Sequence, residues 1–274
     1  MTRAEGELHS ANKKDINLRM KNIPNLFTLL NLIFGCIALV LILQNGIAIM
    51  YNPEGAQYIG IPERIGVASL FIGLAALVDF LDGLVARLFK ATSPMGKQLD
   101  SLADVVSFGV APGMILYQFL RMSFMRQEDG LDVSTLWFLP AFLIPCAGAY
   151  RLARFNIDDS QQYGFKGVPI PAAGLLIASM PLIYWYPNSE SAVSFLQNKW
   201  ALYGIILLVA WLMVSNLPLM ALKFKDYSVK NNLPKFVLLG LAILSAIVLR
   251  WLAVPVVFIL YIVVSLLTAK KNVA

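Results

Sequence analysis

Residues 78–112 read VDFLDGLVARLFKATSPMGKQLDSLADVVSFGVAP, and this stretch places four aspartates within or beside apolar segments. A charged side chain at the centre of a lipid bilayer costs about 2.5–3.5 kcal/mol or more, so these carboxylates need compensation. Asp79 and Asp82 are three residues apart, and Asp100 and Asp104 are four apart, so each pair lies on one face of its helix. A short turn joins the two helices, and we therefore expect all four carboxylates to converge at one end of an antiparallel pair.

The composition is that of a polytopic membrane protein. Of 274 residues, 58% are hydrophobic and only 14% are charged, whereas about 25% are charged in a typical soluble domain. The apolar residues fall in runs near the ~20 residues that span a hydrocarbon core. We therefore expect an all-α helical bundle with about eight transmembrane helices, at residues 23–43, 65–89, 97–120, 136–155, 171–186, 200–222, 236–250 and 252–268.

The distribution of lysine and arginine predicts the topology. With eight spans and both termini in the cytoplasm, 17 of the 22 basic residues lie on the cytoplasmic side, as the positive-inside rule expects. Residues 1–22 form a basic arm ahead of the first predicted span. The net charge of +6 is explained by contact with anionic membrane lipids. Nucleic-acid binding is not indicated, because the sequence has no basic stripe on a soluble domain.

The residue types around the four aspartates indicate a site for hard cations. Both cysteines lie in apolar segments and the one histidine, His9, lies in the polar arm, so the ligands are oxygens that favour Mg²⁺, Mn²⁺ or Ca²⁺ over Zn²⁺. Two such cations would suit displacement at phosphorus. Gly83 removes a side chain beside the cluster, which allows a ligand to approach closely. The alternatives are an ion or proton pathway, or pairing with basic residues of other helices.

The spacing Asp79-x2-Asp82-Gly83-x2-Ala86-Arg87-x8-Gly96-x3-Asp100-x3-Asp104 resembles, position for position, the signature of the CDP-alcohol phosphotransferase family. The resemblance implies a membrane enzyme that transfers the phosphatidyl group of CDP-diacylglycerol to an alcohol and releases CMP. It also implies a homodimer and a six-helix catalytic core, so the predicted units are a basic arm (1–22), this core (23–222) and two additional C-terminal helices (223–274). By the same resemblance, Asp79, Asp82 and Asp100 are ligands of two divalent cations, and Asp104 is both a ligand and the general base. The donor CDP-diacylglycerol would be contacted by Gly83, Ala86, Arg87 and Ser93.

Polar residues on the first predicted helix lie on one face. Asn25, Thr28 and Asn31 recur at three-residue spacing, and the segment NIPNLFTLLN (22–31) resembles the family's first helix, which lines the nucleotide site. We therefore expect them to contact the donor, and ordinary hydrogen bonding between helices is the alternative. Ser93 likewise has an alternative role as a turn residue before Pro94.

The acceptor is predicted from residues outside this signature. Residues 98–112 (QLDSLADVVSFGVAP), 151–156 (RLARFN) and 165–174 (FKGVPIPAAG) resemble the branch of the family that uses L-serine. Arg151 or Arg154 could bind the serine carboxylate, and the alternative is headgroup anchoring. Glycerol 3-phosphate, inositol phosphate and choline remain alternative acceptors, and a cation channel or transporter is the alternative of another class. We expect the protein in the cytoplasmic membrane, with its site facing the cytoplasm.

Overall fold

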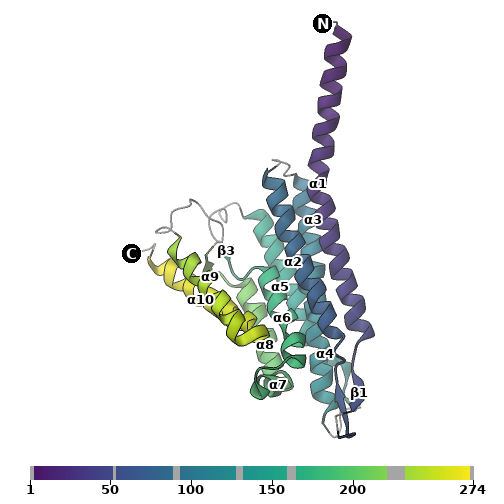
Figure 1. Cartoon of the computed structure of the whole chain (residues 1–274), viewed down its shortest axis with the longest axis vertical. Helices are drawn as coiled ribbons and strands as arrows, with labels where there is room; N and C mark the ends of the chain where they lie inside the picture. Colours follow the sequence, from purple (N-terminus) through teal and green to yellow (C-terminus); the bar gives the residue numbers. More distant parts are fainter. Residues whose placement is uncertain are drawn as a thin grey trace.

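The computed structural model describes residues 3–51, 54–88, 93–127, 132–158, 165–220 and 232–271, which form a bundle of long helices (Figure 1). The helices are α1 (Arg3–Gln44), α2 (Ile65–Leu88), α3 (Pro94–Asp104), α4 (Ala111–Met125), α5 (Leu143–Ile157), α6 (Ile170–Trp185), α7 (Glu190–Leu196), α8 (Lys199–Val214), α9 (Leu233–Leu249) and α10 (Ala253–Lys271). In the bundle α1 packs on α2, α2 on α6, and α5 on α8.

The first helix is longer than the sequence indicated. Instead of beginning at residue 23, α1 starts at Arg3 and continues through Pro24. The arm is rich in alanine, glutamate, leucine, lysine and arginine, which are good helix formers, and the helix continues although an interior proline removes one backbone donor and usually kinks or breaks a helix. The single hydroxyl proton of Thr28 is shared between the carbonyl oxygen of Pro24 (3.2 Å) and a carboxylate oxygen of Asp82 (2.8 Å).

The predicted helix at 97–120 is divided into three parts. Between α3 and α4 lies η1 (Val105–Val110), a π-helical turn that begins directly after Asp104. This turn packs closely on α5, since a Cβ atom built on Gly109 would lie only 3.1 Å from the Cα atom of Pro145. Its other side contacts α1, where the hydroxyl of Ser107 donates to the carbonyl oxygen of Asn31 (3.1 Å).

Several local elements were not expected. The span at 136–155 begins as a 3-10 helix, η3 (Thr135–Phe142), before it continues as α5. The span at 200–222 ends early, at Val214, and is followed by strand β4 (Pro218–Leu219), which pairs antiparallel with β3 (Phe165–Lys166). Strands β1 (Ala48–Tyr51) and β2 (Gln57–Gly60) form a second small antiparallel sheet. These two-residue and four-residue strands leave the molecule essentially all-α.

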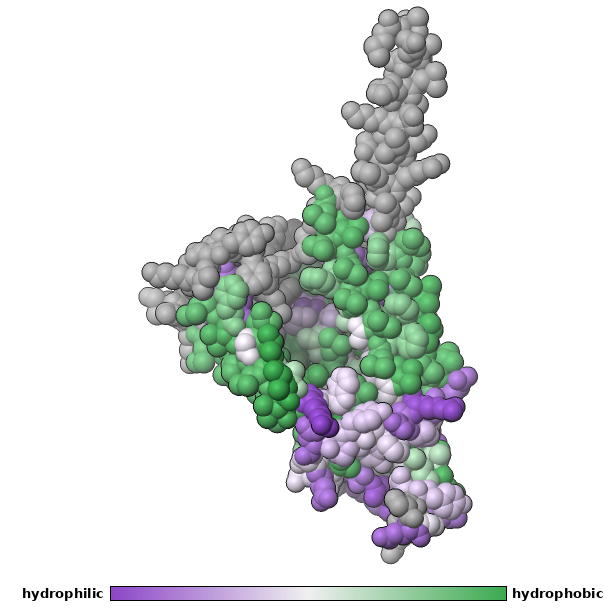
Figure 2. Space-filling view, viewed as in Figure 1, coloured by the Kyte–Doolittle hydropathy of each residue, from purple (hydrophilic) through white to green (hydrophobic). Residues whose placement is uncertain are grey.

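The outer surface of the bundle suits a lipid environment. Hydrophobic side chains cover α1 and α2 as a continuous belt, and hydrophilic residues gather at the end of the molecule that carries β1 and α7 (Figure 2). Within the described ranges, five helices are long and apolar enough to cross a membrane, or six if the bent pair of α7 and α8 forms one span. The structure is thus that of a polytopic membrane protein, and the count of eight spans stays a prediction.

The last two helices form a hairpin beside the bundle (Figure 1). They are joined by the short 3-10 helix η5 (Arg250–Leu252), where Arg250 has a φ of 49°. Helix α9 packs mainly on α10 and exposes large apolar side chains such as Ile247 (74% exposed), whereas α10 packs on α6 and β4. The hairpin is therefore attached to the bundle through α10.

Candidate active site

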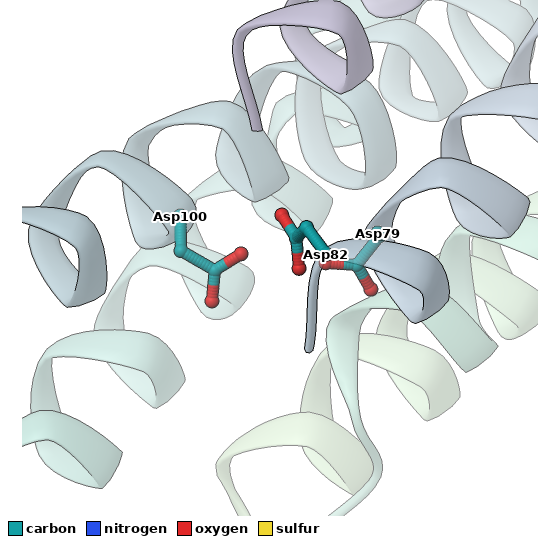
Figure 3. A group of neighbouring side chains, drawn as sticks. All are labelled: Asp79, Asp82 and Asp100. Atoms are coloured by element: carbon teal, nitrogen blue, oxygen red, sulfur yellow. The ribbon is translucent and has the colours of Figure 1, made fainter. Parts of the chain in front are cut away.

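Three of the four aspartates converge between two consecutive helices. Asp79 and Asp82 come from α2 and Asp100 comes from α3, and each offers a carboxylate oxygen within 4.8 Å of the others. Figure 3 shows the carboxylate of Asp100 facing those of Asp79 and Asp82 from the neighbouring helix. The start of α3 is fixed by Ser93, whose hydroxyl oxygen accepts a hydrogen bond from the amide of Gly96 (2.9 Å), a common way to begin a helix.

Asp104 lies one helical turn beyond Asp100 and is only 6% exposed. Its charge interacts with those of Asp79, Asp82 and Asp100, so it belongs to the same cluster electrostatically. The Asn31 side-chain amide donates to one of its carboxylate oxygens (3.3 Å). Asp104 therefore adds a deeply buried carboxylate beside the three that are closest together.

The polar face of α1 lies against this cluster. Besides the bond from Asn31, the hydroxyl of Thr28 donates to a carboxylate oxygen of Asp82 (2.8 Å). The side chain of Asn25, on α1, lies against the start of α3, since a Cβ atom built on Gly96 would be 2.9 Å from the side-chain oxygen of Asn25. The predicted polar stripe thus meets α2 and α3 at the cluster, and Thr28 and Asn31 orient two of the carboxylates.

The cluster has the chemistry that a hard divalent cation requires. No described lysine or arginine forms an ion pair with any of the four aspartates, and one carboxylate oxygen of Asp100 is buried without a hydrogen-bond partner among the described residues. Buried carboxylates are costly unless they are paired or coordinate a metal. The available ligands are all oxygens, as Mg²⁺, Mn²⁺ and Ca²⁺ prefer. The residues present therefore fit a divalent cation.

Open space borders the cluster at Gly83. A Cβ atom built on this residue would meet no described atom within 4 Å, so the α2 backbone is accessible at this point. Ala86 and Arg87 lie in the last turn of α2, and their side chains are outside the part of the chain that the structure describes.

The two arginines that were expected to share a role are placed differently. Arg151 is 6% exposed, and its guanidinium carbon lies 5.9 Å from the centre of the Phe155 ring. Its charge interacts with that of Asp104. Arg154 instead donates to the carbonyl oxygen of Val214 (3.1 Å) and to the side-chain oxygen of Asn216. Arg151 is thus buried and within electrostatic range of Asp104, whereas Arg154 links α5 to the end of α8.

One buried polar residue on the last helix was missed in the sequence. Tyr261 on α10 is 8% exposed, its hydroxyl donates to the carbonyl oxygen of Met220 (3.0 Å), and it interacts electrostatically with Arg151. The signal was a tyrosine and a serine four residues apart, Tyr261 and Ser265, in an otherwise apolar helix. Both lie in the predicted span at 252–268, and periodicity alone does not identify the helix on which such a span packs.

Comparisons with known proteins agree with the chemistry of the cluster. A family model described as CDP-alcohol phosphatidyltransferase matches residues 21–221. A CDP-diacylglycerol--serine O-phosphatidyltransferase of Helicobacter pylori (strain J99) is 34% identical over 251 residues, which are 89% of each chain. The enzyme of the same name from Bacillus subtilis is 34% identical over 60% of this chain and 78% of its own length. An archaetidylserine synthase of Methanothermobacter thermautotrophicus is 31% identical over 62% of each chain.

Proposed function

The chain belongs to the CDP-alcohol phosphatidyltransferase family, and we propose that it transfers the phosphatidyl group of CDP-diacylglycerol to L-serine, giving phosphatidylserine and CMP. The observation that carries this proposal is the convergence of three carboxylates within 4.8 Å, with the buried Asp104 beside them. The acceptor is supported by the names of the relatives, several of which are serine O-phosphatidyltransferases.

In the proposed site, Asp79, Asp82, Asp100 and Asp104 hold two divalent cations, Mg²⁺ or Mn²⁺, with Ca²⁺ as an alternative. When bound, the cations neutralise charge on the phosphate oxygens and on the leaving CMP. Thr28 and Asn31 hold the carboxylates of Asp82 and Asp104 in place. The open backbone at Gly83 and the side chain of Arg87 receive the nucleotide, and Asn25, Ala86 and Ser93 complete the donor site.

Asp104 acts as the general base in this proposal. Its carboxylate takes the proton from the serine hydroxyl, and the resulting oxygen attacks the phosphorus that carries diacylglycerol. The new serine oxygen–phosphorus bond forms as the bond from that phosphorus to CMP breaks, and CMP leaves with the electron pair. Burial at 6% exposure keeps water away from the carboxylate, which favours transfer to serine over hydrolysis of the donor.

Arg151 is the residue that we propose for the serine carboxylate. Arg151 is buried, and its charge interacts with that of Asp104. A serine whose carboxylate is bound to Arg151 would therefore have its hydroxyl near Asp104, the general base. Arg154, the other candidate, is engaged with Val214 and Asn216, and we propose that it positions α5. The bias of lysine and arginine supports a site that faces the cytoplasm, with both termini on that side of the cytoplasmic membrane and eight spans, and we expect a homodimer.

The proposal is tested by the release of CMP. Purified protein receives CDP-diacylglycerol and Mg²⁺ or Mn²⁺, and CMP is measured with serine, glycerol 3-phosphate, inositol phosphate or choline. Release that depends on serine supports the proposal, whereas release with another alcohol alone assigns the chain to a sister enzyme. Folded protein that releases no CMP with any acceptor, and that conducts cations in vesicles, would indicate a channel or transporter.

The role of Asp104 has a separate test. Asp104→Asn should lower kcat by at least about a hundredfold, since general-base catalysis contributes about 10²–10⁴-fold, while the protein still binds CDP-diacylglycerol. Equal losses of donor binding and turnover would indicate that Asp104 is chiefly a metal ligand. Leu102→Ala, two residues earlier on the exposed side of α3 (66% exposed), is the control and should retain activity.

A further inference from the structure

Two buried side chains connect α1 to the segment around Asp104. The side-chain amide of Asn31 donates to the Oδ1 atom of Asp104 (3.3 Å). In the π-helical turn that follows Asp104, the hydroxyl of Ser107 donates to the backbone carbonyl oxygen of Asn31 (3.1 Å). Asn31 and Ser107 are fully buried, where α1 lies beside α3 (Figure 1). Asn31 is therefore bonded to Asp104 through its side chain and to the π-helical turn through its backbone.

The side chain of Asn31 has no other hydrogen bond among the described residues. Its amide oxygen is buried and lacks a hydrogen-bond partner there, and its amide nitrogen faces Asp104 because an ionised carboxylate only accepts hydrogen bonds. The place of the amide thus depends on where the backbone of α1 lies. The bond from Ser107 holds that backbone at Asn31 itself. A shift at Ser107 would therefore pass through Asn31 to the carboxylate of Asp104.

The two segments also touch one turn further along, at Gly35. A Cβ atom built on Gly35 would lie 2.9 Å from the Cα atom of Ser107, which is too close for any residue but glycine unless the backbones move apart. Gly35 follows Asn31 by about one helical turn, and Ser107 follows Asp104 by about one turn. Two contacts one turn apart therefore fix both the spacing and the rotation of α1 relative to Asp104.

Resting on the proposed role of Asp104 as general base, we propose that Ser107 is a positioning residue for that base. Ser107 holds the backbone of Asn31, and the Asn31 amide holds the Oδ1 atom of Asp104. The other carboxylate oxygen, Oδ2, then takes the proton from the hydroxyl of the acceptor. Ser107 does not touch the substrate and acts through Asn31, in a reaction where a misplacement of about 1 Å can cost about 10²-fold in rate.

The test compares Ser107→Ala with wild type in the release of CMP. We expect kcat to fall about 10-fold to 100-fold, because the base is misplaced. The KM for CDP-diacylglycerol should stay within about twofold of wild type, since its proposed contacts are made by other residues. Ser123→Ala is the matched control, because the buried Ser123 hydroxyl also donates to a backbone carbonyl of another segment, that of Gln197 (2.6 Å). This control should lower the melting temperature as much as Ser107→Ala does and keep the wild-type kcat.

A double-mutant cycle separates positioning from a general loss of stability. If Ser107 acts through Asn31, then adding Ser107→Ala to Asn31→Ala should lower kcat by less than about twofold, because coupled residues are not additive. A full further loss in this background would overturn the role of Ser107. So would a wild-type kcat in Ser107→Ala, or an equal loss of kcat in Ser123→Ala.

The failure of this inference is distinguishable from that of the proposed function. A large loss of kcat in Asp104→Asn with none in Ser107→Ala overturns the positioning role and leaves the general base in place. A wild-type kcat in Asp104→Asn overturns the general base and this inference together. If Ser107→Ala does not fold, Ser107→Cys, which keeps a weak hydrogen-bond donor, is measured by the same criteria.

Discussion

Gly83→Ala tests whether this glycine is needed for the helix or for the binding of CDP-diacylglycerol. A Cβ atom at this position would meet no described atom within 4 Å, so the methyl group fits the protein without its substrate. Gly73, on the same helix, has the same open surroundings but lies three turns from Gly83, away from the aspartates. The two substitutions are therefore chemically identical and sterically alike, and they differ only in whether the donor approaches the residue.

The expected magnitudes follow from this geometry. Alanine is favoured over glycine in a helix interior by about 0.5–1 kcal/mol, so each variant should unfold at the same or a slightly higher temperature than wild type. At Gly83 the methyl group enters space that we assign to the nucleotide. Overpacking costs about 1–3 kcal/mol, which corresponds to a loss of about 5-fold to 150-fold in the affinity for CDP-diacylglycerol.

The assay measures the KM for CDP-diacylglycerol from CMP release, together with thermal unfolding of the same preparations in detergent. We expect Gly83→Ala to raise the donor KM with normal unfolding, and Gly73→Ala to leave the donor KM unchanged. A wild-type donor KM in Gly83→Ala would refute the placement of the nucleotide beside this glycine. Early unfolding of Gly83→Ala alone would show that the glycine serves the fold.

Two further substitutions test the groups that hold the site. Thr28→Val removes the hydrogen bond to Asp82 and should lower the affinity for Mn²⁺ by about 10-fold to 100-fold in a titration, as is usual for partners of metal ligands. Thr28→Ser keeps the hydroxyl and should restore the affinity for Mn²⁺. Wild-type affinity in Thr28→Val would contradict this role of Thr28. Arg154→Ala breaks the link to Asn216 and should lower the melting temperature by about 2–4 °C, for a loss of about 1 kcal/mol. The same variant should keep the serine KM, and a tenfold rise in that constant would instead assign Arg154 to the acceptor.

The part of the site that depends on local spacing could be predicted from the sequence. Asp79 and Asp82 share a helical face by their separation, and the short connection to the next helix brings Asp100 to them. The same reasoning placed Thr28 and Asn31 on one side of α1, and the structure shows both bonded to the cluster. Periodicity within one helix and a short turn between two helices are sufficient for these contacts.

Contacts between distant helices could not be predicted in this way. Arg151 and Arg154 are three residues apart and chemically equal, and only the packing of α8 on α5 gives Arg154 a partner at Asn216. Tyr261 is buried because α10 packs on α6 and β4, and the pattern of apolar residues does not indicate this packing. The continuity of α1 through Pro24 was missed because a proline near the start of an apolar run is also a common first residue of a helix.

The π-helical turn at Val105–Val110 makes the length of the chain at this point part of the catalytic design. Each residue of an α-helix advances the side chains by about 100°, and a π turn accommodates one residue more than the regular helix would. The six residues of this turn therefore cover about the rotation that five would cover in a regular helix, and they set the phase of Asp104 relative to the packing face of α4. If the same six residues formed a regular helix, α4 would rotate by about 100° relative to Asp104, so relatives that retain this chemistry with a regular helix here should be one residue shorter in this segment.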